Sequence, residues 1–244
     1  MSPQTTETFA DRVVLVAGGT GALGSAVAQA FLDQRATVVV TQHAARDAQA
    51  AQRFKVADAS RLHVATLDVT DAAAVQSLLD EVMARHGRLD ALVVAVGGWA
   101  GGQPLWAAPA DELSRMLNAN LHAAHVLARV VAPLMRTAGR GAIVNVAAKT
   151  GVDPTAGNGA YAAAKAAALA LMASLAADLA GSGVRVNSVL PQVIDTAANR
   201  QAMPDAAAAR SWTSPESIAR VILFLCSDDA AAIHGAAIPV YGAG

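Results

Sequence analysis

The chain has little cysteine, few aromatic residues and little charge. Of its 244 residues one is cysteine, 4% are aromatic and 15% are charged, and the formal net charge is -1. The single Cys226 cannot form a disulfide within the chain, so the fold does not depend on an oxidising compartment. It follows an apolar run at 221–225, where a cysteine is typically a small buried hydrophobe rather than a nucleophile.

Basic blocks and apolar runs of membrane length are also missing. Without a cluster of Lys and Arg the chain has no footprint for nucleic acid. The longest charge-free apolar run, 166–177, is shorter than the ~20 residues needed to span a bilayer. The first ten residues have no charged start followed by an apolar stretch, so we expect no signal peptide. We therefore expect a cytoplasmic protein that binds neither nucleic acid nor membrane.

Apolar residues are abundant, and alanine accounts for much of them. Hydrophobic residues make up 54% of the chain, alanine alone makes up about a quarter, and the mean hydropathy is +0.38. This composition excludes disorder, and alanine favours helices. The chain is long enough to bury a full core, and no linker or repeat divides it. We expect one domain over residues 1–244.

Short apolar runs alternate with helical patterns along almost the whole chain. The runs are rich in Val, Leu and Ile and do not alternate with polar residues, as in strands covered on both faces of a parallel sheet. Helical patterns lie between them at 71–85, with Asp71 as a candidate N-cap, and at 111–135. This order predicts an α/β fold, a Rossmann-type doubly wound parallel sheet of about seven strands with helices on both faces. The expected strands are 13–17, 37–41, 62–67, 91–96, 142–146, 184–190 and 237–241.

Two segments, 97–109 and 191–214, have no core pattern and are expected to be loops beside a ligand crevice. A glycine-rich turn at 18–24 joins the first strand to a helical pattern. Small residues let the backbone approach a pyrophosphate closely, and the helix N-terminus supplies N–H groups and the positive end of its dipole. A tight turn also favours glycine, but directly after the first strand this turn indicates nucleotide binding.

Tyr161 and Lys165 stand four positions apart in a helical pattern, so their side chains share one face. A free tyrosine has a pKa of ~10, and a nearby cation favours the phenolate. The two residues are therefore a candidate general acid/base pair. In an arbitrary helix such a pair is often just two surface residues, but after a glycine loop it indicates catalysis.

These motifs together resemble the short-chain dehydrogenase/reductase family, over essentially the whole chain. Gly18 and Gly24 match the first and third glycines of the family's fingerprint, whereas Ala22 stands at the second. The resemblance implies an NAD(P)-dependent oxidoreductase in which Tyr161 passes the proton. Lys165 would bind the nicotinamide ribose and lower the pKa of the tyrosine. A third catalytic residue is implied at Asn120, which matches the asparagine that supports a water leading to that lysine.

The resemblance also assigns residues to the dinucleotide. Asp68 matches the aspartate that contacts the adenine, and a helix N-cap is the alternative interpretation. The segment after the sixth strand would cover the nicotinamide, with Thr196 binding its carboxamide. The set expected to bind the cofactor is Gly18, Thr20, Gly21, Leu23, Gly24, Gln42, Asp68, Val69, Gly97, Tyr161, Lys165, Pro191, Val193 and Thr196.

The choice between NADH and NADPH depends on the end of the second strand. Members that bind NAD have a carboxylate there for the ribose hydroxyls, whereas this chain has Gln42. His43 and Arg46 are the nearest groups for a 2'-phosphate, and either could equally be part of a solvated helix start. The sequence leans slightly towards NADPH and leaves the choice open.

The family's serine, thirteen positions before the tyrosine, is Ala148 here. Either the enzyme is degenerate or its substrate does not need that hydrogen bond. Loops at 97–102 and 148–149 resemble those of dihydropteridine reductases, which also lack the serine, whereas 214–225 resembles carbonyl-reducing members. Candidate substrate contacts are Ala148, Trp99 and Trp212; each indole is either a platform for a flat ring or an apolar plug beside the crevice.

The sequence thus predicts a reductase that transfers a hydride from NAD(P)H to a small molecule and resembles a dihydropteridine reductase. A carbonyl/alcohol or 3-oxoacyl reductase of the same family is the first alternative. A dinucleotide sensor without chemistry is the second, although such proteins often lose the tyrosine or the lysine. Family resemblance further implies a homodimer or homotetramer packed through the helices that begin near Asp111 and Tyr161. We expect no metal site.

Overall fold

The computed structural model describes residues 9–43, 52, 54–203 and 211–242. Its seven strands form one sheet in the order β3-β2-β1-β4-β5-β6-β7, and every neighbouring pair is parallel. All seven expected strands are confirmed, with ends that differ by at most two residues. They are β1 (Val13–Ala17), β2 (Thr37–Gln42), β3 (Leu62–Thr66), β4 (Ala91–Val94), β5 (Gly141–Val146), β6 (Val184–Pro191) and β7 (Ala237–Val240).

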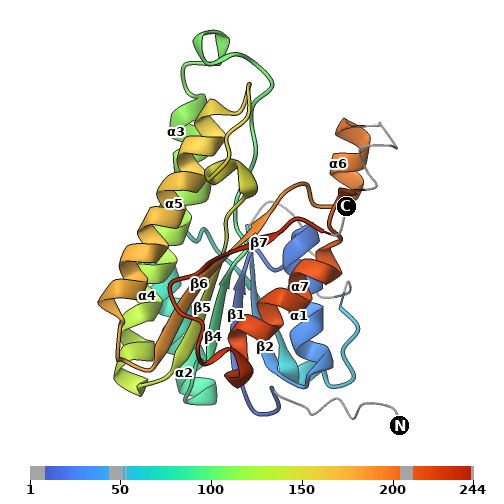
Figure 1. Cartoon of the computed structure of the whole chain (residues 1–244). Coiled ribbons are helices and arrows are strands. Elements are labelled where there is room, and N and C mark those ends of the chain that lie inside the picture. Colours follow the sequence, from blue (N-terminus) through green and yellow to red (C-terminus); the bar gives the residue numbers. More distant parts are fainter. Residues whose placement is uncertain (1–8, 44–51, 53, 204–210, 243–244) are drawn as a thin grey trace.

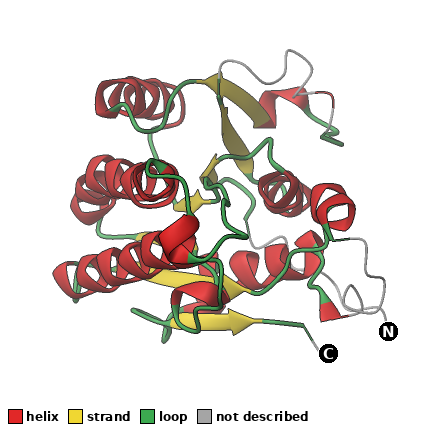
Figure 2. Cartoon of the chain, turned by 90° about the horizontal axis from the view of Figure 1, so that it is seen from above, coloured by secondary structure: helices red, strands yellow, loops and turns green. Residues whose placement is uncertain are grey.

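Helices cover both faces of the sheet, which confirms the doubly wound fold (Figures 1 and 2). One apolar core lies between the sheet and α2, α4 and α5, and a second core lies between the sheet and α1 and α7. The α-helices are α1 (Ala22–Asp33), α2 (Ala72–His86), α3 (Glu112–Leu117), α4 (Ala123–Ala138), α5 (Gly159–Asp178), α6 (Ala197–Ala202) and α7 (Pro215–Cys226). Short 3-10 turns span Ala59–Arg61, Leu105–Ala107, Lys149–Gly151 and Asp228–Ala230.

The expected N-cap of α2 is confirmed. The carboxylate of Asp71 accepts hydrogen bonds from the backbone N–H groups of Ala73 and Ala74 at 2.8 and 3.3 Å. The helix ends at Gly87, which has a left-handed φ of 70° that glycine adopts without strain. Local sequence therefore determines both ends of this helix.

The long helix expected at 111–135 is interrupted. Between α3 and α4 the chain makes a π-helical turn, Asn118–His122. The side-chain amide of Asn120 donates to the carbonyl oxygen of Met116 at 3.0 Å, inside the helix ladder. Single π turns of this kind are frequent at functional sites.

The segment expected to be irregular at 191–214 contains the short helix α6. Thr196 begins it, because its hydroxyl accepts a hydrogen bond from the N–H of Asn199 at 3.1 Å. This N-cap explains a helix that the apolar pattern could not predict, since α6 has no buried residue. Residues 204–210 of the segment lie outside the described part.

Cys226 is buried at the end of α7, as expected, with 3% of its surface exposed. Burial raises the pKa of its thiol to about 12. The thiol is therefore not a nucleophile near neutral pH, since only the thiolate reacts.

Among the described residues, α5 is the one helix long and apolar enough to cross a membrane by length and composition. This is weak evidence, because the core helix of a soluble protein passes the same test. The inner face of α5 packs on the sheet through Met172 and Ala176. The expectation that the chain binds no membrane stays a prediction.

Candidate active site

Part of the predicted set gathers in a crevice at the carboxyl ends of β4 and β5, beside the first turn of α1, which is where doubly wound sheets bind ligands. Its volume is about 280 Å³. Six of its lining residues are sequence-predicted: Leu23, Gly97, Trp99, Asn120, Tyr161 and Lys165. Seven others complete it: Ala95, Val96, Gly98, Val146, Ala147, Ile194 and Asn199.

The first two turns of α5 place Tyr161 and Lys165 side by side. The Lys165 ammonium lies 5.8 Å from the centre of the Tyr161 ring. It donates a hydrogen bond of 2.9 Å to the carbonyl oxygen of Val146, the last residue of β5. Lys165 is only 6% exposed, so this carbonyl is what holds the charged group at the end of the strand.

Burial shifts the pKa values of both residues in the structure. It raises the pKa of Tyr161 to about 12 and lowers the pKa of Lys165 to about 8. Desolvation by burial is the cause of both shifts, so the expectation that the lysine lowers the pKa of the tyrosine stays a prediction. The ammonium faces the ring and the Val146 carbonyl, so the cost of burying a phenolate dominates. At neutral pH Tyr161 keeps its proton, which suits a proton donor.

Asn120 ties the crevice to the loop after β4. Its amide nitrogen donates to the carbonyl oxygen of Gly98 at 3.0 Å, and its amide oxygen accepts from the N–H of Gly98 at 3.3 Å. It is 3% exposed and lies in the π-helical turn. Asn120 therefore lies at the distortion of the helix and also faces the crevice, and its catalytic role stays a prediction.

The glycine loop is so tightly folded that side chains are excluded from part of it. A Cβ at Gly24 would overlap the carbonyl oxygen of Gly18 and lie 2.8 Å from its carbonyl carbon. Gly18 itself has a φ of 78°. Gly21 is the N-cap of α1 and has no side chain with which to cap the helix. Thr20 lies partly exposed in the same turn, and these features fit an anion at the helix N-terminus.

Gly97 leaves room at the catalytic end. A Cβ on Gly97 would lie 2.6 Å from the Asn120 amide oxygen and 3.3 Å from the Lys165 ammonium. Any side chain would therefore fill the space beside the lysine. Together with the glycine loop, this cradle fits the nicotinamide half of a dinucleotide.

The adenosine end, meaning the residues predicted to contact the adenosine half of the dinucleotide, is less complete than the catalytic end. Asp68 accepts hydrogen bonds from the N–H and hydroxyl of Thr70 at 2.9 and 2.7 Å, which hold its pKa below the ordinary value. It therefore makes a local turn, and Asp71 rather than Asp68 is the helix N-cap. The side chain of Val69 packs into the core beside α2. Neither residue lines the crevice within the described part, and their adenine contacts stay predictions.

Gln42 ends β2 with its amide directed at the neighbouring strand. Its nitrogen donates to the Thr66 hydroxyl at 2.9 Å, while its buried oxygen has no partner among the described residues. His43 follows, exposed, and Arg46 lies outside the described residues. The described part of this end has no carboxylate on β2.

The segment after β6 is anchored beside the crevice. The N–H of Thr213 donates to the carbonyl oxygen of Val193, and the N–H of Asp195 donates to that of Thr213, at 3.0 and 2.9 Å. This pairing directs Ile194 and Asn199 into the crevice. Sequence reasoning missed both as site residues, although their place beside Thr196 was an available signal. Pro191 is buried as the last residue of β6, and the cofactor roles of Pro191, Val193 and Thr196 stay predictions.

Of the three candidate substrate contacts, only Trp99 lines the crevice among the described residues. Ala148 is buried, 5% exposed, and follows the lining residue Ala147. Trp212 is half-buried next to Thr213, in the segment that pairs with residues 193–195. Its role as a platform is a prediction that the geometry does not support.

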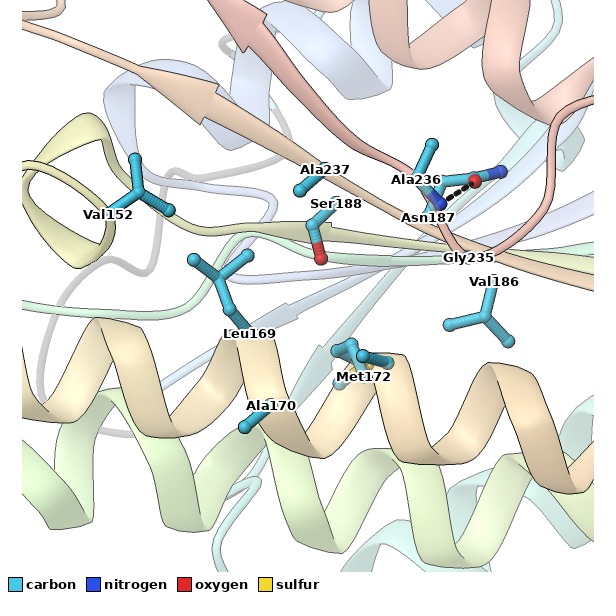
Figure 3. A pocket seen from close by; sticks show the side chains of 11 residues that line it. Val152, Leu169, Ala170, Met172, Val186, Asn187, Ser188, Gly235, Ala236 and Ala237 are labelled. Carbon is cyan, nitrogen blue, oxygen red and sulfur yellow. Dashed lines mark hydrogen bonds between the residues drawn. The ribbon is translucent and has the colours of Figure 1, made fainter.

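A second cavity, of about 250 Å³, lies between α5 and strands β6 and β7 (Figure 3). Its walls are mainly small and apolar, and the Ser188 hydroxyl points into it. Asn187 is engaged elsewhere, because it donates to Ile233 and accepts from the N–H of Ala236. None of the predicted site residues lines this second cavity.

The chain is also similar in sequence and in fold to known oxidoreductases. A family model described as Enoyl-(Acyl carrier protein) reductase matches residues 18–242. The chain is 34% identical to cis-4-hydroxycyclohexanecarboxylate dehydrogenase of Sinomonas cyclohexanicum, over 97% of each chain. It is 33% identical to meso-2,3-butanediol dehydrogenase of Serratia marcescens, over 96% of this chain and 94% of that one. The structure of levodione reductase superposes with a TM-score of 0.87 at 26% identity, covering 96% and 97% of the two chains.

Proposed function

The chain belongs to the short-chain dehydrogenase/reductase family, and on that premise we propose that it is an NAD(P)-dependent oxidoreductase that interconverts a carbonyl compound and an alcohol. The observation that supports this most directly is the convergence of Tyr161, Lys165, Asn120 and Gly97 on one crevice. Two relatives of matching length are named as dehydrogenases of hydroxyl compounds, a hydroxycyclohexanecarboxylate and a butanediol. A bound reduced nicotinamide supplies a hydride.

The residues of the chain supply the proton and hold the cofactor in position. Tyr161 is protonated at neutral pH, since burial raises its pKa to about 12, and it donates that proton to the substrate oxygen. Lys165 is held by Val146 at the floor of the site, where its donors can reach a ribose hydroxyl. Gly97 leaves the space for that ribose. In the reverse direction, Tyr161 must first lose its proton, and the resulting phenolate then accepts the proton from the alcohol.

A second candidate substrate is a quinonoid dihydropterin. Ala148 has no hydroxyl to polarise a carbonyl, and Trp99 lines the crevice where a flat ring would stack. An electron-poor quinonoid ring needs the hydride and the Tyr161 proton without an oxyanion donor. The loop resemblance at 97–102 supports this candidate, whereas none of the relatives and neighbours named above is named for a pterin.

For the cofactor we favour NADPH. Gln42 places no negative charge at the end of β2, and the exposed His43 follows it. At the end of β2 itself a 2'-phosphate would meet Gln42 and His43 rather than a carboxylate.

We also propose a homodimer or homotetramer. The outer face of α5 exposes small side chains, which would let a helix of a second copy approach closely. They are Ala163, Ala166, Ala170, Ala173 and Ala177. Sedimentation of the purified protein would show a single monomeric species if this proposal is wrong.

The central test is the substitution Tyr161→Phe. Removing the hydroxyl should lower turnover by at least about 100-fold, because the proton donor is lost. The dissociation constants for NADH and NADPH, measured separately by titration, should change by less than about threefold, since the ring remains. Unchanged turnover would show that Tyr161 is not the acid.

The substrate class is tested on the same wild-type protein. Initial rates with ring ketones, open-chain ketones and quinonoid dihydropterin separate the two candidates. Reduction of ketones alone would exclude the pterin candidate. Tight dinucleotide binding without turnover of any of these substrates would instead favour a sensor.

A further inference from the structure

Trp99 and Asn158 join two loops that border the crevice. Trp99 follows β4, and Asn158 precedes α5, three residues before Tyr161. The indole nitrogen of Trp99 donates a hydrogen bond to the amide oxygen of Asn158 at 2.8 Å. This bond links positions 59 residues apart in the chain, so the fold creates it rather than local sequence.

The amide of Asn158 is itself oriented. Its nitrogen donates to the hydroxyl of Thr155 at 2.8 Å. Turning the amide over would place its NH2 group against the indole N–H, which can only donate, so the Trp99 bond fixes the orientation of the amide. Asn158 thus presents a fixed acceptor to the indole.

The backbones of the two loops meet at the same place. The N–H of Gly102 donates to the carbonyl oxygen of Gly157 at 2.8 Å. A Cβ on Gly101 would lie 2.6 Å from that oxygen and 3.2 Å from a ring carbon of Trp99. The loops approach so closely that only glycine fits, and the indole rests on this junction.

Because of these contacts, the Trp99 indole presents an exposed but fixed aromatic face. Trp99 is 62% exposed, yet its nitrogen is bound and its ring touches the loop junction. A side chain held in place before binding loses little entropy when a ligand arrives. Aromatic rings in turn prefer offset or edge contacts with flat partners. Such a face favours a planar ring over an open chain.

We propose that Asn158 is a positioning residue that holds Trp99 as a stacking wall, so that the crevice selects planar-ring carbonyl substrates. This inference rests on the proposed function and specifies its substrate class. Asn158 acts through Trp99 and does not touch the reacting atoms.

The test uses two diketone probes, the flat bicyclic isatin and the open-chain 2,3-butanedione. For Asn158→Ala the KM for isatin should rise about three- to tenfold with kcat within twofold, which is the range of one aromatic contact. The kinetics with 2,3-butanedione should stay within twofold. Equal effects on both probes would overturn the inference, as would a wild-type enzyme that reduces 2,3-butanedione but not isatin.

Further variants separate positioning from loss of fold. Trp99→Phe should raise the KM for isatin, and adding Asn158→Ala to it should cost nothing more, because the two residues act through one contact. Asn158→Asp retains the acceptor and should restore the wild-type KM to within twofold. Trp106→Phe, at an indole that is 89% exposed, is the matched control and should change nothing. If the effects of Trp99→Phe and Asn158→Ala on the KM for isatin were additive, the two residues would not act through one contact.

A structural readout completes the test. In a background with Trp106→Phe and Trp212→Phe, the emission of Trp99 should shift to the red in Asn158→Ala as the indole loses its fixed environment. An unshifted spectrum would show that the bond does not hold the ring. Failure of the proposed function is distinguishable, since the wild-type protein would then reduce neither diketone and Tyr161→Phe would change no rate.

Discussion

The two ends of the crevice are built differently. At the catalytic end, Tyr161, Lys165 and Asn120 lie on helices that pack against the sheet, and buried hydrogen bonds fix the lysine and the asparagine. At the adenosine end, Gln42 and Asp68 are more exposed and make their hydrogen bonds with neighbouring threonines. The first end is part of the core, whereas the second is a set of polar side chains at strand ends.

This difference separates chemistry from selectivity. A proton donor needs a fixed position, which packed elements provide. Discrimination between two dinucleotides needs only one or two charges at an exposed strand end, which can change without disturbing the core. The glycine loop joins the two ends, so changes there should affect both.

The largest effect is expected for Gly24→Ala. The new Cβ would overlap the Gly18 carbonyl oxygen and lie 2.9 Å from the Cα of Gly19, and these are backbone atoms that cannot rotate away. Dinucleotide affinity should fall by at least about 1,000-fold, and the free energy of unfolding should fall by about 2–4 kcal/mol. Titration with NADPH and urea denaturation measure the two quantities.

The matched control for Gly24→Ala is Ala22→Gly, which restores the family's second glycine. Ala22 is exposed in the first turn of α1, so its removal opens no cavity. Affinity should stay within about threefold, and stability should fall by no more than about 1 kcal/mol. If Gly24→Ala binds NADPH normally, the loop does not connect the two ends through one ligand.

The next largest effect is expected on turnover, from a substitution at the catalytic end alone. Lys165→Met should lower turnover by about 100-fold, because the ammonium that orients the ribose and Tyr161 is lost. It should not lower stability at pH 7, since burying an ammonium is costly and methionine fills the same space. The free energy of unfolding should therefore stay equal or rise by about 1–3 kcal/mol.

The difference in unfolding free energy between Lys165→Met and wild type should change with pH in one direction. Burial lowers the pKa of Lys165 from 10.5 to about 8 in the folded state. The free-energy cost of burying the Lys165 ammonium is therefore fully present below pH 8, and it is relieved as the pH rises towards 10.5. The difference in unfolding free energy between Lys165→Met and wild type should shrink from pH 7 to pH 9.5. A constant difference would mean that the lysine is not desolvated.

The sequence predicts the catalytic end better than the adenosine end. The four-residue spacing of Tyr161 and Lys165 places both on one face of any helix, and Val-rich runs specify the strands that support it. The Lys165 bond to Val146 and the Trp99 bond to Asn158 join residues 19 and 59 positions apart, so no local pattern contains them. The raised pKa of Tyr161 likewise depends on burial, which only the packed structure provides.

The smallest effect should come from the adenosine end, in Gln42→Asp. A carboxylate at the end of β2 would accept hydrogen bonds from ribose hydroxyls and repel a 2'-phosphate, so preference should move from NADPH to NADH by about tenfold. Gln42→Asn, which adds no charge, should leave the preference within about twofold. Separate titrations with the two dinucleotides measure it, while kcat at saturation should stay unchanged because Tyr161 and Lys165 are untouched. A wild-type protein that already prefers NADH would refute the proposed cofactor, and a change in kcat would show that the two ends are not independent.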